Sequence, residues 1–171
     1  MEAAKYSVVE ALRNGSSVEI RALKAADQED MLAAVSRISG ESLYRRFFGA
    51  KRYFSEREKA FFLNVDFVDH VALVAVANDV GRPCIVGGGR YIVVRPGTAE
   101  LAFAVIDEYQ GRGIGSALMR HLVLIGRDAG IKSLLAEVLA ENIPMLKVLQ
   151  TSGLALQVEH RADVIYATLR I

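Results

Sequence analysis

One glycine-rich segment constrains the fold more than any other part of the sequence: Gln110-Gly111-Arg112-Gly113-Ile114-Gly115-Ser116. It follows an apolar run, 101–106, and opens a segment, 114–129, whose apolar side chains recur at helical spacing. Alternate glycines let the backbone approach a ligand closely, and the unpaired N–H groups at a helix start attract an anion. We therefore expect a strand, a tight turn and a helix, with a phosphate or pyrophosphate at the turn; the alternative is a turn that serves packing alone.

The spacing of these glycines excludes three better-known glycine motifs. A dinucleotide fingerprint needs a third glycine three residues after the second, and those positions hold Ser116 or Leu118. A phosphate-binding loop of the nucleotide-hydrolase kind would end in Gly-Lys-Ser/Thr, a tripeptide that the sequence lacks. A nucleophile elbow would place Ser116 between two glycines, each two residues away, which is not the case here.

The remaining pattern predicts a mixed α/β fold in one domain, 17–171, preceded by an N-terminal extension, 1–16. Period-two alternation or apolar runs bounded by turn residues predict strands at 18–23, 71–77, 85–94, 101–106, 132–139, 154–159 and 164–169. Helical spacing and start signals predict helices at 27–38, 41–48, after the capping-box pattern Ser55-Glu56-Arg57-Glu58, at 114–129 and after Asn142-Ile143-Pro144. Short connections favour antiparallel pairing for the strands between 71 and 106.

Composition narrows the class of protein. The 171 residues include 21 basic and 20 acidic ones, and this balance argues against a dedicated nucleic-acid binder. The one cysteine, Cys84, and three widely separated histidines give no metal-ligand spacing, so we expect no metal. No apolar run is long enough to span a membrane, and the start lacks a leader's apolar stretch, so we expect a cytoplasmic protein. An oligomer is compatible with the sequence.

The turn at 110–115 resembles the Gln/Arg-x-x-Gly-x-Gly/Ala loop of the GNAT superfamily of acetyl-CoA-dependent N-acetyltransferases, and the element order of 17–171 is similar as well. The resemblance implies a mostly antiparallel sheet whose parallel pair is splayed around acetyl-CoA. It implies that the backbone of 110–116 holds the pyrophosphate and that Asn142 lies near the thioester arm. It also implies that the strand before the turn pairs with the pantetheine chain through Phe103, Ala104 and Val105.

A narrower resemblance is to bacterial protein lysine acetyltransferases of the Pat kind. It rests on phrases spread along the chain: 42–48, Val65-Asp66, 99–103 and 136–145. This resemblance implies an exposed lysine on a protein as the acceptor, typically on an AMP-forming acyl-CoA synthetase. Two alternatives stay open: an enzyme that acetylates a small amine, and a non-catalytic module that senses acyl-CoA.

Glu100, ten residues before Gln110, lies close to where Pat-type enzymes carry a catalytic glutamate, and we take it as the general base. Glu137 is the reserve candidate. Seven residues after Asn142 many family members carry a tyrosine that protonates the leaving thiolate, but this chain has Leu149 there.

A basic cluster with interleaved phenylalanines, Arg45-Arg46-Phe47-Phe48 with Lys51-Arg52, has two interpretations. One is docking of an acidic face of a protein substrate, and the other is a solvated helix face over two core phenylalanines. The three glycines at 87–89, inside a strand pattern, indicate a bulge or a close backbone contact.

Overall fold

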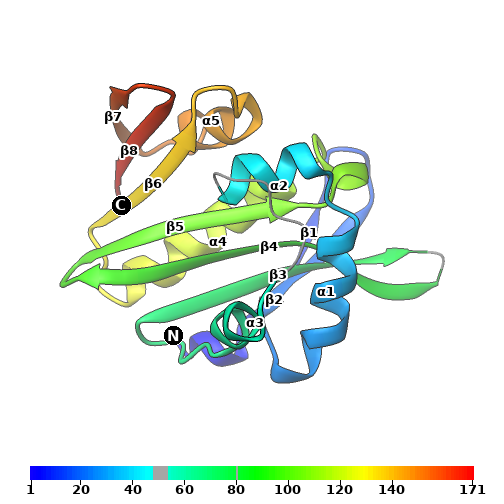
Figure 1. Ribbon diagram of the computed structural model, residues 1–171. Coiled ribbons are helices and arrows are strands. Elements are labelled where there is room, and N and C mark those ends of the chain that lie inside the picture. The colour runs from blue at the N-terminus through cyan, green and yellow to red at the C-terminus, as the bar shows by residue number, and fades with distance from the viewer. Residues whose placement is uncertain (48–53, 80) are drawn as a thin grey trace.

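In the computed structural model, which describes residues 1–47, 54–79 and 81–171, eight strands form one sheet in the order β1-β2-β3-β4-β5-β6-β8-β7 (Figure 1). The strands are β1 (Ser7–Ala11), β2 (Ser17–Ala22), β3 (His70–Asp79), β4 (Arg82–Arg95), β5 (Thr98–Val105), β6 (Ser133–Leu139), β7 (Ala155–Arg161) and β8 (Val164–Arg170). Every pair of neighbours is antiparallel except β5 and β6. The predicted mixed α/β fold with a mostly antiparallel sheet is confirmed.

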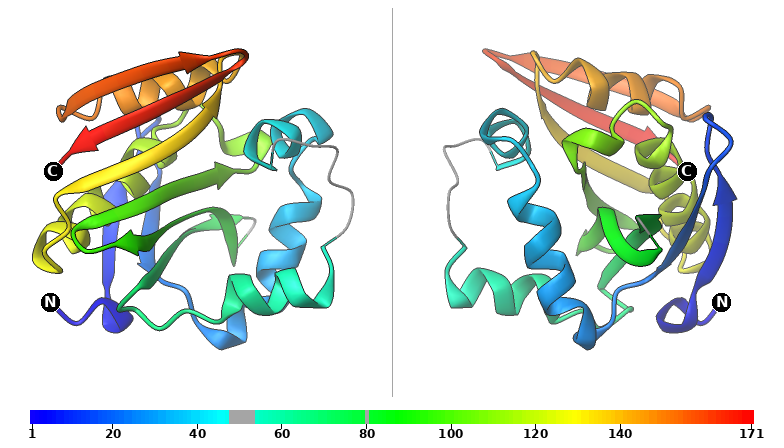
Figure 2. Two further views of the ribbon diagram at one scale, coloured as in Figure 1. Left: turned by 60° about the vertical axis from the view of Figure 1, so that its left-hand side comes forward. Right: turned by 90° about the vertical axis from the view of Figure 1, so that its right-hand side faces the viewer.

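Helices cover both faces of this sheet. They are α1 (Gln28–Ser36), α2 (Gly40–Phe47), α3 (Glu56–Leu63), α4 (Ile114–Asp128) and α5 (Ile143–Gln150), with single 3₁₀ turns at Ala3–Lys5, Ala25–Asp27 and Asp107–Tyr109. Figure 2 shows α1, α2 and α3 on one side of the sheet and α4 on the other. The capping box before α3 is present, because the Ser55 hydroxyl accepts from the Glu58 N–H while the Glu58 carboxylate accepts from the Ser55 N–H.

The parallel pair is short, and its end opens the sheet. β5 and β6 are paired only at three positions: Thr98 with Ser133, Ala99 with Leu134 and Glu100 with Leu135. Both strands continue beyond these residues, β5 to Val105 and β6 to Leu139, but they diverge (Figure 1). The sheet therefore contains a V-shaped gap whose narrow end is at Glu100.

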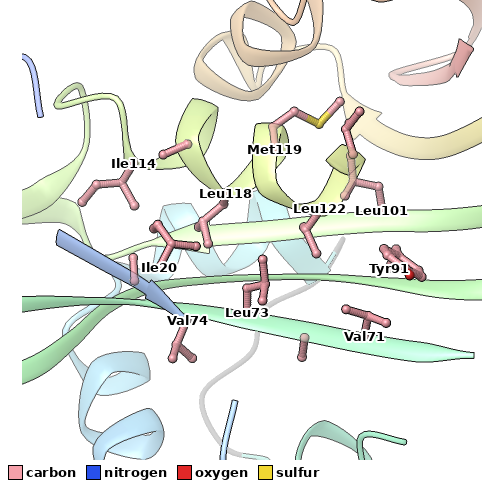
Figure 3. Packing of buried hydrophobic residues seen from close by; sticks show 14 of the residues in the cluster. Ile20, Val71, Leu73, Val74, Tyr91, Leu101, Ile114, Leu118, Met119 and Leu122 are labelled. Atoms are coloured by element: carbon pink, nitrogen blue, oxygen red, sulfur yellow. The ribbon is translucent and has the colours of Figure 1, made fainter. Parts of the chain in front are cut away.

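The part of the core that holds α4 lies between this helix and the face of the sheet that it covers. Leu118 and Leu122 of α4 point toward Leu73 of β3 and Leu101 of β5, and all four are almost completely buried (Figure 3). Burying a leucine contributes about 1.5–3 kcal/mol of transfer free energy, so this contact fixes where the start of α4 lies relative to β5.

Two glycines of β4 allow α4 to come close. A Cβ atom on Gly89 would lie 3.0 Å from the Leu122 side chain, and one on Gly87 would lie 3.1 Å from the Ala104 carbonyl oxygen and 3.3 Å from Ile114. The pairing of β3 with β4 also shifts register between Ala75 and Val76, opposite this stretch. The close-contact interpretation of the three glycines at 87–89 is confirmed.

Residues 1–16 are joined to the sheet. β1 pairs with β2 over its full length, and Leu12 is buried. The Tyr6 hydroxyl shares a hydrogen bond with Nδ1 of His121 on α4, while Nε2 of that histidine donates to the Glu10 carboxylate at 2.8 Å. The extension thus contacts α4 through the buried side chain of His121. In the basic cluster, Phe48, Lys51 and Arg52 lie outside the described residues.

Tyr91 provides a test of this core. Its side chain is completely buried, and its hydroxyl has no hydrogen-bond partner among the described residues, while burial raises its pKa to about 12. A buried hydroxyl without a partner costs desolvation, so Tyr91→Phe should leave the free energy of unfolding unchanged or raise it by up to about 1 kcal/mol. The matched change Tyr6→Phe removes a hydroxyl that is bonded to His121 and should lower this free energy by about 1 kcal/mol. Urea unfolding measures both; a large loss in Tyr91→Phe would contradict the packing.

Candidate functional site

A cavity of about 910 Å³ occupies the gap between β5 and β6, a volume suited to a sizeable ligand. It brings together side chains and backbone from β5, from the turn before α4 and from the start of α5. The sequence-predicted residues that line it are Glu100, Phe103, Ala104, Val105, Gln110, Gly111, Gly113, Ile114, Gly115, Ser116 and Asn142. Arg112 is the one predicted residue that is not among the lining residues.

The glycine-rich turn presents backbone donors to this cavity. Gly111 and Gly113 have φ of +74° and +97°, a left-handed region that other residues rarely adopt. Gly113 is the N-cap of α4 and supplies no side-chain cap, and the first intrahelical bond is donated by Ala117 to the Gly113 carbonyl at 2.9 Å. The N–H groups of residues 114–116, in the first turn of α4, have no intrahelical acceptor. Together with the helix dipole, these N–H groups favour a negative charge at this position.

Two polar side chains of the turn are engaged in holding it. The Gln110 amide nitrogen donates to the Val105 carbonyl oxygen at 3.1 Å, which ties the turn to the end of β5. The Arg112 guanidinium donates to the Glu108 carbonyl oxygen at 2.7 Å and lies 4.3 Å from the centre of the Tyr109 ring. The Arg112 side chain therefore braces the 3₁₀ turn before the loop.

The Arg13 side chain places a positive charge beside the turn, and the sequence did not predict this. Arg13 comes from the connection between β1 and β2, where its N–H donates to the Arg112 carbonyl oxygen at 3.4 Å. Its side chain passes 3.7 Å from where a Cβ of Gly113 would lie, and it lines the cavity. It is exposed and makes no ion pair with the described residues. The turn signal Asn14-Gly15-Ser16 was visible in the sequence, but no local pattern places that turn beside residue 113.

The free edge of β5 faces the gap. Residues 101–105 pair with β4 on one side, at positions 87–91, while no strand of the described residues pairs with them on the other. Strand backbone groups alternate between the two neighbours, so those directed at the gap make no ladder bonds. Such an edge can bind an extended chain by main-chain hydrogen bonds. Phe103, Ala104 and Val105 lie along this edge.

Glu100 lies at the narrow end of the gap and faces away from α4. Its neighbours Ala99 and Leu101 are buried, whereas Glu100 is exposed and lines the cavity. Side chains alternate along a strand, so Glu100 shares its face with its register partners Ile92 of β4 and Leu135 of β6. Glu137 is two residues further along β6 on the same face and also lines the cavity.

Two arginines lie close together over that face, Arg90 on β4 and Arg46 on α2. Arg90 of β4 donates to Nε2 of His70 at 2.9 Å and to the Phe62 carbonyl oxygen at 3.2 Å. Arg46 of α2 stacks on the Phe47 ring at 4.7 Å. Burial lowers the pKa of Arg46 to about 10, and burial together with the charge of Arg46 lowers the pKa of Arg90 to about 10. Both stay protonated at neutral pH.

Asn142 and Leu149, the two positions after β6 for which the family resemblance implies a role or a usual residue, have different environments. Asn142 is the N-cap of α5, where its side-chain oxygen accepts from the Met145 N–H at 3.2 Å, and it also lines the cavity. Leu149 is 1% exposed and packs in the core, away from the cavity. Leu149 therefore offers no contact to a ligand in the gap.

The described part of the chain has neither a metal-binding cluster nor a membrane-spanning helix. No group of three or more His, Cys, Asp or Glu side chains there is arranged to hold a metal ion. No helix within residues 1–47, 54–79 and 81–171 is both long enough and apolar enough to cross a membrane.

Comparisons with known proteins agree with this geometry. Residues 39–154 match the family described as acetyltransferase (GNAT) family. Acetyltransferase Pat of Mycolicibacterium smegmatis is 33% identical over 146 residues, which are 83% of this chain and 42% of that protein. An acetyltransferase of Pseudomonas aeruginosa is 31% identical over 138 residues, 80% of this chain and 74% of that protein. The chain thus spans less than half the length of the M. smegmatis relative.

A solved structure extends the likeness to nearly the whole fold. The GNAT domain of S. lividans PAT superposes with a TM-score of 0.87 at 30% identity, covering 96% of this chain and 97% of that one. The likeness therefore includes strands on both sides of the gap.

His70 gives a prediction for stability against pH. Burial and the nearby charge of Arg90 lower the pKa of His70 below its ordinary value of 6.5. The folded protein resists protonation that the unfolded chain accepts, so the free energy of unfolding should fall as pH drops below about 6.5. In His70→Gln this fall should be shallower, because that site no longer titrates. Melting temperatures between about pH 7.5 and pH 5 measure the effect, with exposed His160→Gln as the control. Parallel curves for wild type and His70→Gln would contradict it.

Proposed function

We propose a specific reaction for this chain, which belongs to the acetyltransferase (GNAT) family: transfer of the acetyl group of acetyl-CoA to the side-chain amine of a lysine on a protein. The sequence resemblance to Pat-type enzymes and the relatives named Pat support this choice of acceptor. An AMP-forming acyl-CoA synthetase is the acceptor protein that the resemblance favours.

The position of Glu100 carries the proposal. It is the last residue at which β5 is paired with β6, so its carboxylate stands where the two sides of the gap meet. On one side lie the free edge of β5 and the turn before α4; on the other lies the sheet face opposite α4, with Glu137 and Arg90. A carboxylate there can accept a proton from an amine that approaches from that opposite face.

We place the cofactor on the side of the gap that is formed by β5 and the turn before α4. The pyrophosphate of acetyl-CoA binds the N–H groups of 111–116 and the Arg13 side chain, and the pantetheine arm runs along Phe103, Ala104 and Val105 toward Glu100. Backbone donors at the free edge of β5 orient the arm, and Asn142 lies close to its thioester end. Gln110 keeps the turn attached to β5 through the Val105 carbonyl oxygen.

The reaction needs a base because a lysine is protonated at neutral pH. With a pKa near 10.4, forming the free amine at pH 7 costs about 4–5 kcal/mol. Glu100 accepts that proton, the amine nitrogen attacks the thioester carbon, and a backbone N–H stabilises the oxyanion. The carbon–sulfur bond then breaks and coenzyme A leaves as a thiolate. A thiol has a pKa near 8.5, so this thiolate is an adequate leaving group and takes its proton from water.

Glu100→Gln tests the base and the reaction together. With acetyl-CoA and a purified acyl-CoA synthetase or a host lysate, wild type should acetylate lysines, as mapped by mass spectrometry. Glu100→Gln should lower kcat by about 10²-fold or more near pH 7 and by less near pH 9, where free amine is plentiful. Glu137→Gln is the matched control on β6 and should retain most activity. If Glu100→Gln kept the wild-type rate at every pH, Glu100 would not be the base. If the wild-type protein bound acetyl-CoA but transferred no acetyl group, it would be a non-catalytic sensor of acyl-CoA.

Arg13 and Arg112 form a matched pair for the cofactor site, because both flank the turn and only Arg13 lines the cavity. A charge-assisted hydrogen bond to phosphate contributes about 1.5–3 kcal/mol. Arg13→Ala should therefore weaken acetyl-CoA binding by about 10–100-fold in calorimetry, whereas Arg112→Ala should change it by less than about 3-fold. The reverse order would assign the side-chain contact with the phosphate to Arg112 instead of Arg13.

A further inference from the structure

Arg46 and Arg90 are two neighbouring guanidinium groups that line the cavity, and neither is paired with a carboxylate of a described residue. Arg90 bonds to two neutral acceptors, the Phe62 carbonyl oxygen and His70, and its guanidinium lies 4.8 Å from the centre of the Phe62 ring. Arg46 stacks on Phe47 and makes no hydrogen bond or ion pair with any residue that the structure describes. The residues outside the description, 48–53 and 80, contain no Asp or Glu, so they cannot supply a carboxylate.

Two other arginines of the same cavity are neutralised within the chain. Arg45, beside Arg46 on α2, is paired with Glu41. Arg161 on β7 is paired with Glu159 through two bonds of 2.9 and 3.2 Å. Arg13 and Arg95 also line the cavity without an ion pair to a described residue, but both are exposed to solvent. Arg46 and Arg90 differ from them because they are neighbours and both are partly buried.

Leaving two like charges in a partly buried place is unfavourable. Burial disfavours each charge, and the charge of Arg46 further lowers the pKa of Arg90. An anion that bound both guanidinium groups would remove both penalties. Guanidinium groups match carboxylates in shape because they donate two parallel hydrogen bonds. The pair is thus suited to a carboxylate that comes from outside the chain.

We propose that Arg46 and Arg90 form a subsite for the side-chain carboxylate of an Asp or Glu close to the acetylated lysine in the protein substrate. This rests on the proposed function, because it presupposes a lysine at Glu100. His70 is the positioning residue: its unprotonated Nε2 accepts from Arg90 and holds that guanidinium toward the cavity.

The strand register sets how far the acidic residue lies from the lysine. Arg90 pairs with Ala102, and Glu100 pairs with Ile92, so Arg90 and Glu100 are diagonal neighbours on one face. Diagonal neighbours on paired strands are about 7–8 Å apart, and an extended peptide advances about 3.3 Å per residue. The acidic residue should therefore lie within about three residues of the lysine.

A peptide series tests the subsite. Each peptide carries one lysine and a single Glu at one of the neighbouring positions, and its partner carries Gln there. For the best position, wild type should show a kcat/KM at least about 10-fold higher for the Glu peptide, the size expected of a charge-assisted bond. This preference should disappear in Arg46→Met, in Arg90→Met and in the double variant. Arg46→Lys, which keeps the charge and loses the fork, should retain part of it.

The controls separate the subsite from folding and from net charge. Arg82→Met removes a charge from an exposed position of β4 outside the cavity and should keep the full preference. Melting curves confirm folding, and if Arg90→Met loses its structure, Arg46→Met decides, since its guanidinium bonds to no described residue. A preference that survives in the folded variants would overturn the subsite.

The outcomes also separate this proposal from the proposed function. If wild type acetylates Glu and Gln peptides equally, the subsite is wrong and lysine acetylation stands. If wild type acetylates no peptide or protein but acetylates free amines, the protein acceptor is wrong. In that case a free amino acid is compared with its amide: a carboxylate preference lost in the Arg46 and Arg90 variants keeps the anionic subsite for a small acceptor, and no preference overturns it.

Discussion

The site depends on one feature of the sheet: the hydrogen bonds between β5 and β6 stop after Glu100 and Leu135. Because β5 continues to Val105 without a partner on that side, its backbone can bind an extended ligand instead of a strand. The same divergence makes the cavity and places Glu100 at its narrow end. A sheet that stayed fully paired at this position would have no free edge and no gap beside Glu100.

Strand alternation then divides the gap into two environments. Ala99 and Leu101 are buried against α4, while Glu100 between them faces the opposite side with Arg90. The half of the gap that we propose for the cofactor depends on how closely α4 approaches the sheet, and the missing Cβ atoms of Gly87 and Gly89 allow that approach. Core packing and the geometry of the proposed anion site at Gly113 are therefore linked, because α4 carries both.

Much of the fold could be predicted because its signals are local. The glycines of 111–115, the capping box at Ser55 and the apolar runs each lie within a few residues, and the strands and helices that they predicted are present. The environment of Arg13 was not predictable in this way. It depends on a hairpin that brings residue 13 beside residue 113, and the weak pattern of 1–16 gave no sign that β1 joins the sheet. The burial of Leu149 in the core was not predictable either, because its spacing from Asn142 says nothing about how the residue packs.

The basic cluster shows where charge counting along the sequence fails. Arg45 and Arg46 are adjacent, yet Arg45 is paired with Glu41 and Arg46 turns toward Arg90, forty-four residues away in the chain. Neither interpretation of the cluster, a docking face or a solvated helix face, describes that difference, because it arises from α2 lying over β4. In most parts of a protein, residue type, packing and charge all favour the same structure, and exceptions concentrate at functional sites. Two like charges near Glu100, neither of them paired with a carboxylate of a described residue, are such an exception. The stability that they cost is recovered if an acidic group of the acceptor binds there, and the same contact would bring its lysine to the base.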